Sequence, residues 1–206
     1  MTLGDLNLNL TGSEKLRSVS AADYLAGEAV ARRKHEYVDG QIYAMVGGRY
    51  AHNLIASNVL IELGLQLKGT PCRALNSDSK VRIQTAAGVS FYYPDASVVC
   101  GENIRTDEFQ DAPCIVVEVL SLSTRRIDEG EKLQAYMKLP SLHVCILLEQ
   151  DFPTAVVHRR IESGFRQEIL QGLDAVIALP TINVHLALAA LYAEVKFIAE
   201  PEESYG

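Results

Sequence analysis

One apolar run limits what this chain can fold into. Residues 114–120 read CIVVEVL, and six of these seven residues are apolar, which is typical of a strand buried on both faces of a sheet. The exception is Glu118. An unpaired carboxylate is costly to bury, so it either becomes neutral or finds a cation. The run therefore predicts a buried strand that carries a polar site, whose partners come from elsewhere in the chain.

The segments around this run alternate between strand and helix patterns. Asp39-Gly40 is a turn dipeptide between two strand-like runs, so residues 35–46 predict a hairpin. Apolar residues at helical spacing predict a helix over 50–68, which Gly69 and Pro71 end. Further strands are expected at 72–76, 80–84, 89–93, 96–100, 143–149, 154–161 and 164–170.

Three more segments complete the expected fold. Ser20 can cap a short helix over 21–27, and the D-x-x-E spacing of Asp128 and Glu131 predicts a helix that runs to Leu139. Residues 182–195 fit either a strand or a helix. This order predicts an α/β (or α+β) domain, with a central mixed sheet flanked by the helices near 50–68 and 128–139.

The ends of the chain differ from its body. Residues 1–19 are polar and irregular and predict a flexible arm, residues 20–198 predict a single domain, and residues 199–206 predict a disordered tail. The first residues lack the basic start and apolar stretch of a secretory signal. No segment approaches the ~20 apolar residues of a membrane span. We therefore expect a cytoplasmic protein without a membrane partner.

The net charge and the cysteine pattern argue against two kinds of site. The formal net charge of −7 argues against a protein that coats nucleic acid through a broad basic surface, although a local basic groove remains compatible with it. The four cysteines, Cys72, Cys100, Cys114 and Cys145, include no CxxC pair. They therefore indicate buried reduced thiols rather than a zinc site.

Asp95 is the first candidate partner of Glu118. It follows Pro94 at the start of a predicted strand, and two carboxylates on adjacent strands can share a divalent ion. Taken alone, Pro-Asp is more often a turn pair. Glu118 alone is more often a structural ion-pair partner, here of Arg82 or Arg126.

Lys132 is the second candidate partner. It follows Glu118 by fourteen positions, in the first full turn of the predicted helix over 128–139. That helix can pack back across the strand and bring the ammonium group to the site, where it can orient a water or stabilise charge on a phosphate. Taken alone, Lys132 reads as a partly exposed helical lysine, so we expect Lys132→Ala to leave the fold intact.

The order of these motifs resembles a known family. The stretches HEYVDGQIYAM, YYPDASVVC, VVEVLSLST and DEGEKLQAYMKLPSLHVCILL, together with His52-Asn53, are similar to the Uma-type restriction endonuclease family of the PD-(D/E)xK nuclease superfamily. The resemblance covers roughly Tyr24 to Arg160 and implies a restriction endonuclease-like fold. It also implies that Asp95 and Glu118 are metal ligands. The superfamily's usual lysine position is Leu120 here, and Lys132 fills the place on the following helix.

Three further residues match or accompany this pattern. Glu36 stands at a recurrent family position and is a candidate third acid near the metal, while pairing with Arg33 or Lys34 is an equal alternative. His52 can hydrogen-bond a phosphate or a catalytic acid, and a helix-capping or buried structural histidine is equally plausible. Tyr136, one turn after Lys132, either supports that lysine or packs in the core.

The leading hypothesis is an endodeoxyribonuclease that depends on Mg²⁺, with Mn²⁺ as a substitute. Asp95, Glu118 and the backbone carbonyl of Val119 hold the ion, which polarises the scissile phosphate. Lys132 positions the attacking water. The alternative is a nuclease-like module that binds DNA or a protein without cutting. A hydrolase of RNA or nucleotides is a third reading. We also expect a homodimer, through the apolar run VHLALAALY over 184–192.

Overall fold

The computed structural model describes residues 18–45, 47–86, 88–101, 108–121 and 128–197. The predicted arm over 1–19 lies outside these residues except for its last two, and the predicted tail over 199–206 lies outside them entirely. Within the described residues, no helix has both the length and the apolar character that crossing a bilayer requires. The single domain over 20–198 stays a prediction.

A six-stranded sheet contains the run that opened the sequence analysis. Its order is β11 (Gly164–Gln171), β10 (Thr154–Ile161), β9 (Val144–Glu149), β8 (Pro113–Leu120), β6 (Ala96–Cys100) and β3 (Cys72–Asn76). Only the β8–β9 pair is parallel, so the sheet is mixed. Every residue of β8 is buried, which confirms the prediction of a fully buried strand.

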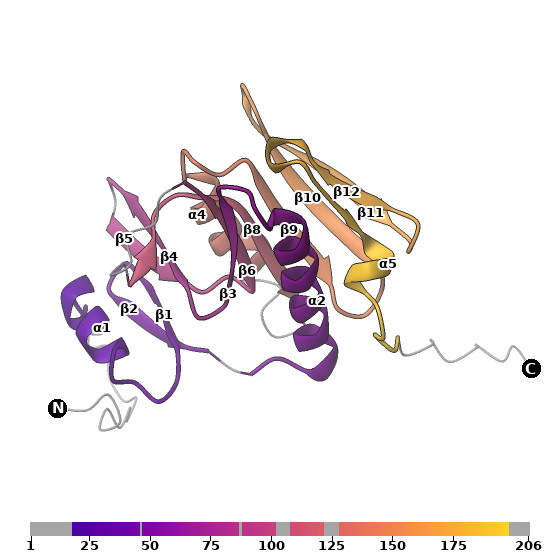
Figure 1. The fold of residues 1–206 in the computed structure, drawn as a ribbon. Coiled ribbons are helices and arrows are strands. Elements are labelled where there is room, and N and C mark those ends of the chain that lie inside the picture. The colour runs from indigo at the N-terminus through magenta and orange to yellow at the C-terminus, as the bar shows by residue number, and fades with distance from the viewer. Residues whose placement is uncertain (1–17, 46, 87, 102–107, 122–127, 198–206) are drawn as a thin grey trace, which may run out of the picture.

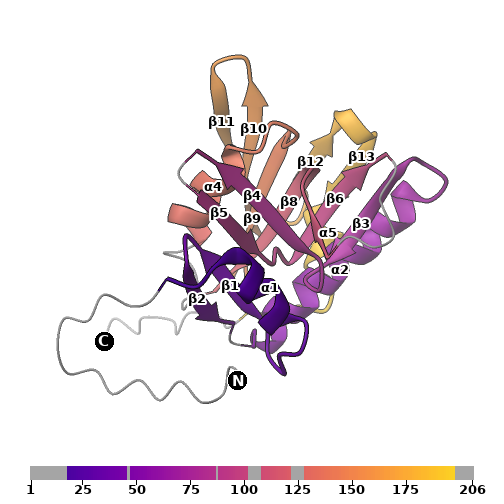
Figure 2. The ribbon, with the colours of Figure 1, turned by 90° about the vertical axis from the view of Figure 1, so that its left-hand side faces the viewer.

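A second sheet stands beside the first, where the sequence predicted one central sheet. Its five strands are β2 (Gln41–Ala44), β1 (His35–Val38), β5 (Gly88–Tyr92), β4 (Lys80–Thr85) and β7 (Phe109–Gln110), in that order. Figure 2 shows this sheet together with α1 (Ala21–Glu28). The β1–β2 hairpin turns at Asp39 and Gly40, whose φ angles of 44° and 92° are the left-handed values of a two-residue hairpin turn.

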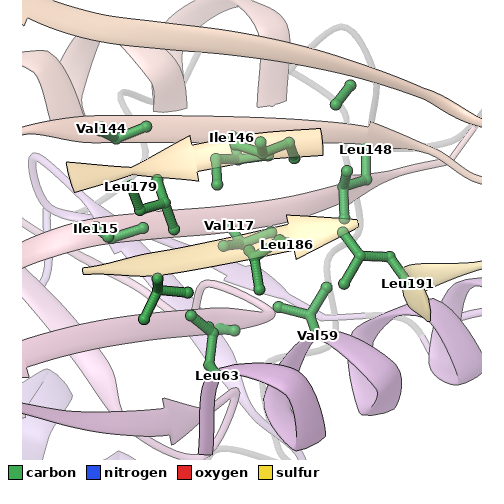
Figure 3. Packing of buried hydrophobic residues seen from close by; sticks show 14 of the residues in the cluster. Val59, Leu63, Ile115, Val117, Val144, Ile146, Leu148, Leu179, Leu186 and Leu191 are labelled. Atoms are coloured by element: carbon green, nitrogen blue, oxygen red, sulfur yellow. The ribbon is translucent and has the colours of Figure 1, made fainter. Parts of the chain in front are cut away.

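The helix α2 (Tyr50–Leu67) packs on one face of the six-stranded sheet (Figure 1). Its buried residues are those of the predicted apolar stripe: Ile55, Val59, Leu63 and Leu67. Figure 3 shows Val59 and Leu63 pointing toward side chains of β8 and β9 and of a third, two-stranded sheet. This layer positions the N-terminal turn of α2 at one end of the strands.

The C-terminal apolar run belongs to the same core. Residues 182–195, which fitted a strand or a helix, form both: the strand β13 (Val184–Ala187) and, directly after it, the helix α5 (Leu188–Leu191). β13 pairs with the preceding strand β12 (Val176–Leu179). The large apolar side chains of this run are buried within the chain: Val184, Leu186, Leu188, Leu191 and Tyr192. The expectation that VHLALAALY offers free surface to a second copy is therefore wrong, because its own chain covers those side chains.

The second predicted helix forms on the opposite face of the sheet. It begins at Asp128 as predicted, but its first five residues form a π-helix, η1 (Asp128–Lys132), and its α-helical part is α4 (Leu133–Met137). Leu133 and Tyr136 enter a second core between β8, β9, β4 and β5. Side chains alternate along a strand, so Glu118 points toward this second core while its neighbours Val117 and Val119 face α2.

The cysteines differ from expectation. Cys72 and Cys100 are direct cross-strand partners of β3 and β6 and form a disulfide, so the expectation of reduced thiols is wrong for this pair. Cys114 and Cys145 are free and buried, as expected. The local sequence carried no sign of the disulfide because it depends on the register of two strands that lie 28 residues apart.

The two faces of α2 give a matched test of the first core. Leu63 is fully buried and Leu65, two residues on, is 67% exposed. We expect Leu63→Ala to lower the free energy of unfolding by about 2–5 kcal/mol, because it removes packed methyl groups and leaves a cavity. Leu65→Ala should change it by no more than about 0.5 kcal/mol. Urea unfolding of both variants measures the difference, and equal losses would contradict this packing.

Candidate active site

Five residues named from the sequence line one cavity of about 650 Å³: His52, Asp95, Glu118, Val119 and Lys132. They come from the first turn of α2, the residue before β6, the strand β8 and the end of η1. The cavity therefore lies where both main sheets and two helices meet. The arrangement expected for Asp95 and Glu118, on neighbouring strands and at one cavity, is the arrangement that the structure has.

Strand register places the two acids. β6 and β8 are antiparallel with Ala96 opposite Val117, so Asp95 comes next to Glu118 on the adjoining strand. The Val119 N–H donates a hydrogen bond of 2.8 Å to Oδ2 of Asp95. This bond fixes the orientation of the Asp95 carboxylate. The sequence suggested Val119 as a contributor through its carbonyl, and the contact seen here is made by its N–H group.

The cation beside Glu118 is Lys132. Its Nζ lies 2.9 Å from Oε1 of Glu118 and 2.9 Å from Oε1 of Glu36. The side chains of Lys132 and Glu118 are 6% and 5% exposed, so this ion pair is buried. The alternative partner Arg82 instead forms a 2.7 Å pair with Asp111, and Arg126 lies outside the described residues. The expectation of a partly exposed Lys132 is wrong, because its side chain is buried and its Nζ lies against Glu118, Glu36 and the ring of Tyr92.

Tyr136 completes the surroundings of Glu118. It stands four residues after Lys132, and its hydroxyl donates a 2.9 Å hydrogen bond to the same Oε1 atom. Burial raises the pKa of the Tyr136 phenol well above its usual value, and the Glu118 charge raises it further. The phenol therefore stays protonated and acts as a donor. Its ring also packs against Tyr92, so both roles suggested for Tyr136 apply.

Glu36 links the site to the second sheet. Besides Lys132, its Oε1 accepts a 3.2 Å hydrogen bond from the Tyr93 N–H. Of the two alternative partners, Lys34 instead bonds the Ser77 carbonyl at 2.8 Å and pairs with Asp78. Glu36 is therefore held against Lys132 rather than against the basic residues before it.

Behind Glu36 lies an acid that the sequence did not single out. The side chain of Glu28, at the end of α1, is 5% exposed and accepts hydrogen bonds from the His35 N–H at 2.9 Å and the Tyr93 hydroxyl at 3.0 Å. Its other oxygen lies 3.0 Å from His35 Nδ1. A glutamate near a helix end ordinarily reads as a solvated residue, so local sequence carried no signal for this role.

His52 stands in the first turn of α2. Its Nε2 lies 3.3 Å from Oδ2 of Asp95, which places the ring against the proposed metal ligand. A β-carbon on Gly48 would lie 2.6 Å from His52 Nδ1 and 2.8 Å from the Asn53 side chain. Only glycine allows the chain to pass this close to the ring. The helix N-cap is Arg49, so the capping role for His52 is not the one found.

The side chains at the cavity can be compared with the ligands that a divalent ion requires. The described residues contain no group of three or more His, Cys, Asp or Glu side chains arranged to hold a metal. A cage made wholly of protein side chains is therefore absent from this part of the chain. Mg²⁺ often takes only one or two carboxylates and completes its shell with water and phosphate oxygens. Asp95 and Glu118, at one cavity, fit that requirement.

Removing Lys132 should now affect stability as well as chemistry. Lys132→Ala leaves Glu118 and Glu36 buried without their shared cation, and we expect a loss of about 3–5 kcal/mol in unfolding free energy. Adding Glu118→Gln should recover part of this loss, since it removes one of the uncompensated charges. Lys138→Ala, at an exposed position six residues on, is the matched control and should be near neutral. Urea unfolding at pH 7 distinguishes these outcomes, and an unaffected Lys132 variant would contradict the buried pair.

A family model and two known proteins are similar to this chain in sequence. The family model Uma2, described as "Putative restriction endonuclease", matches residues 21–190. The protein named "Uncharacterized protein slr1290", from Synechocystis sp. (strain ATCC 27184 / PCC 6803 / Kazusa), is 32% identical over 180 residues, which cover 87% of this chain and 94% of that protein. The protein named "Uncharacterized protein sll1609", from the same organism, is 32% identical over 158 residues, which cover 75% and 87%.

A solved structure has the same fold. It is the crystal structure of a "putative nuclease belonging to DUF820" from Anabaena variabilis ATCC 29413. It matches with a TM-score of 0.64 at 21% identity, over 79% of this chain and 91% of that one. The architecture is therefore restriction endonuclease-like, as the sequence predicted. With the family model matching most of its length, this chain belongs to the Uma2 family.

Proposed function

We propose that the protein is a Mg²⁺-dependent endonuclease that hydrolyses DNA phosphodiester bonds at the cavity described above. One observation carries this proposal: Asp95, Glu118 and Lys132 line the same cavity, although they come from three separate segments. Membership of a family described as restriction endonucleases supports it. Fold alone would not, because one fold can host unrelated chemistry.

Asp95 and Glu118 are the residues that would hold the ion, with the Val119 carbonyl as the proposed third ligand and Mn²⁺ as a substitute for Mg²⁺. When bound, a divalent ion supplies Lewis-acid polarisation of the scissile phosphate. The protein's part is to fix the carboxylates beforehand. The Val119 N–H does so for Asp95, and the Tyr136 hydroxyl does so for Glu118.

Lys132 supplies positive charge where negative charge develops on the phosphate. Its Nζ is held between two carboxylates, so its position is set before substrate arrives. Leu120, which stands at the superfamily's usual lysine position, is buried in the second core and cannot serve. We assign Glu36 to positioning Lys132, and His52 to positioning Asp95 or contacting a phosphate oxygen.

The direct test is a cleavage assay on varied DNA with Mg²⁺, Mn²⁺ or EDTA. We expect cleavage with either metal and none with EDTA. Asp95→Asn keeps an oxygen that can accept the Val119 hydrogen bond but removes the charge that would bind the ion. It should therefore slow cleavage by about a hundredfold or more, equivalent to about 3 kcal/mol of transition-state stabilisation. Asp151→Asn, at an exposed position, is the matched control and should keep the wild-type rate.

Other results of the cleavage assay would point to a different function, substrate or site. Binding of DNA without cleavage under every metal condition would favour the alternative, a nuclease-like binding module. Preferential cleavage of RNA or of a small phosphodiester would move the substrate class away from DNA. Equal activity of the Asp95 and Asp151 variants would refute the assigned metal site.

We also propose a cytoplasmic homodimer, although the large apolar side chains of 184–192 are buried within the chain and offer it no surface. The remaining support is functional: a two-fold pair of sites can cut both strands of a duplex, and symmetric dimers are the commonest oligomers. Light scattering at micromolar concentration tests it, and a monomer would count against it.

A further inference from the structure

We propose that the wall of the cavity formed by Arg33, Lys34 and Ser77 binds a second phosphate of the substrate, so that the site takes a polynucleotide strand rather than a small phosphodiester. This inference rests on the proposed function, since it assigns the substrate class of the same cavity. It adds a binding subsite, with Arg33 as its principal residue.

The size and lining of the cavity suggest more than one ligand group. A volume of about 650 Å³ is typical of sites for whole small molecules and exceeds what one phosphate needs. Besides the residues of the metal site, the lining includes Arg33, Lys34, Ser77 and Tyr93. Three of these form one contact cluster: Lys34 bonds the Ser77 carbonyl at 2.8 Å, and its Nζ lies 5.6 Å from the Tyr93 ring centre.

Arg33 has the chemistry of a phosphate ligand. It is exposed at the cavity, and within the described part of the chain its side chain makes no hydrogen bond or ion pair. A guanidinium group presents five donors in a planar fork that can bind a phosphate through two hydrogen bonds. Such a group, at the edge of a cavity that would hold a scissile phosphate, is placed to bind a neighbouring phosphate of the same strand.

Other charged residues lie near Tyr93, which lines the same cavity as Arg33. Lys80 is buried, its Nζ lies 5.6 Å from the same Tyr93 ring, and it forms no ion pair among the described residues. Lys34 pairs with Asp78, and the pKa of that carboxyl is lowered by its hydrogen bond with Lys34. Glu28 contacts Tyr93 from behind. Arg33 and Lys34 therefore give this wall of the cavity two cations, in a chain whose formal net charge is −7.

Arg32 provides the matched control. It is also exposed and adjoins Arg33 in the sequence, but it does not line the cavity. General attraction between DNA and surface charge would weaken equally when either arginine is removed. A built subsite predicts that only the arginine at the cavity matters.

The experiment measures binding separately from cleavage. Wild type, Arg32→Ala, Arg33→Ala and Arg33→Lys are titrated into a fluorescein-labelled single-stranded oligonucleotide in EDTA, and anisotropy is recorded at several salt concentrations. We expect Arg33→Ala to raise Kd about tenfold and to reduce the salt slope by about 0.7. Arg33→Lys should fall in between, because it keeps the charge but loses the fork. Arg32→Ala should raise Kd less than about twofold.

A second arm uses bis(4-nitrophenyl) phosphate with Mn²⁺ as a substrate that has a single phosphate. Arg33→Ala should lose much less activity on it than on an oligonucleotide, because this substrate has no second phosphate for Arg33 to bind. If wild type cleaves neither DNA nor bis(4-nitrophenyl) phosphate, the proposed function fails. The anisotropy measurements of oligonucleotide binding still test the subsite in that case. Equal Kd values for Arg32→Ala and Arg33→Ala, or no oligonucleotide binding by wild type, would overturn the subsite. Melting temperatures within 2 °C of wild type are required of each variant.

Discussion

The buried contact of Lys132 with Glu118 and Glu36 is the interaction on which the rest of this structure depends. It joins three segments: the central strand β8, the strand β1 of the second sheet, and the helix that follows β8. A buried charge that loses its partner costs several kcal/mol, so none of these segments can move away alone. The two apolar cores described above determine which layers pack together, and this contact determines how two of those layers are aligned beside the cavity.

The charges do not balance, and the imbalance is chemically useful. Lys132 forms ion pairs with two carboxylates, Glu118 and Glu36, and a third carboxylate, Asp95, lines the same cavity as Lys132. Carboxylates held this close together either take up a proton or attract a cation. The residues that make the fold costly without Lys132 therefore include Glu118, one of the two carboxylates to which we assign the divalent ion. In this protein, structural charge compensation and the proposed chemistry depend on the same side chains.

Local patterns in the sequence predicted what depends on local physics. The stripe of α2, the hairpin at Asp39-Gly40 and the buried strand β8 follow from periodicity and turn chemistry, and the three main site residues lie at one cavity as expected. Features that depend on strand pairing were missed. The division into two main sheets, the two-residue strand β7 and the Cys72–Cys100 disulfide all require knowing which strands are neighbours. The role of Glu28 was missed for the same reason, because its partners come from other segments.

The position of the lysine has a physical explanation in the second core. Leu120 lies two residues after Glu118 and so faces the same side of β8, where it is fully buried among Leu133, Tyr136 and Leu147. A charged side chain there would displace apolar packing, whereas the next helix can deliver an ammonium group to the edge of that core. The π-helical turn ends at Lys132, and Tyr136 follows four residues later on the same face, so both side chains reach one oxygen of Glu118. π-helical turns recur at functional sites in other proteins. Here the turn lets a strand keep its apolar packing while a neighbouring helix supplies the cation that the strand lacks.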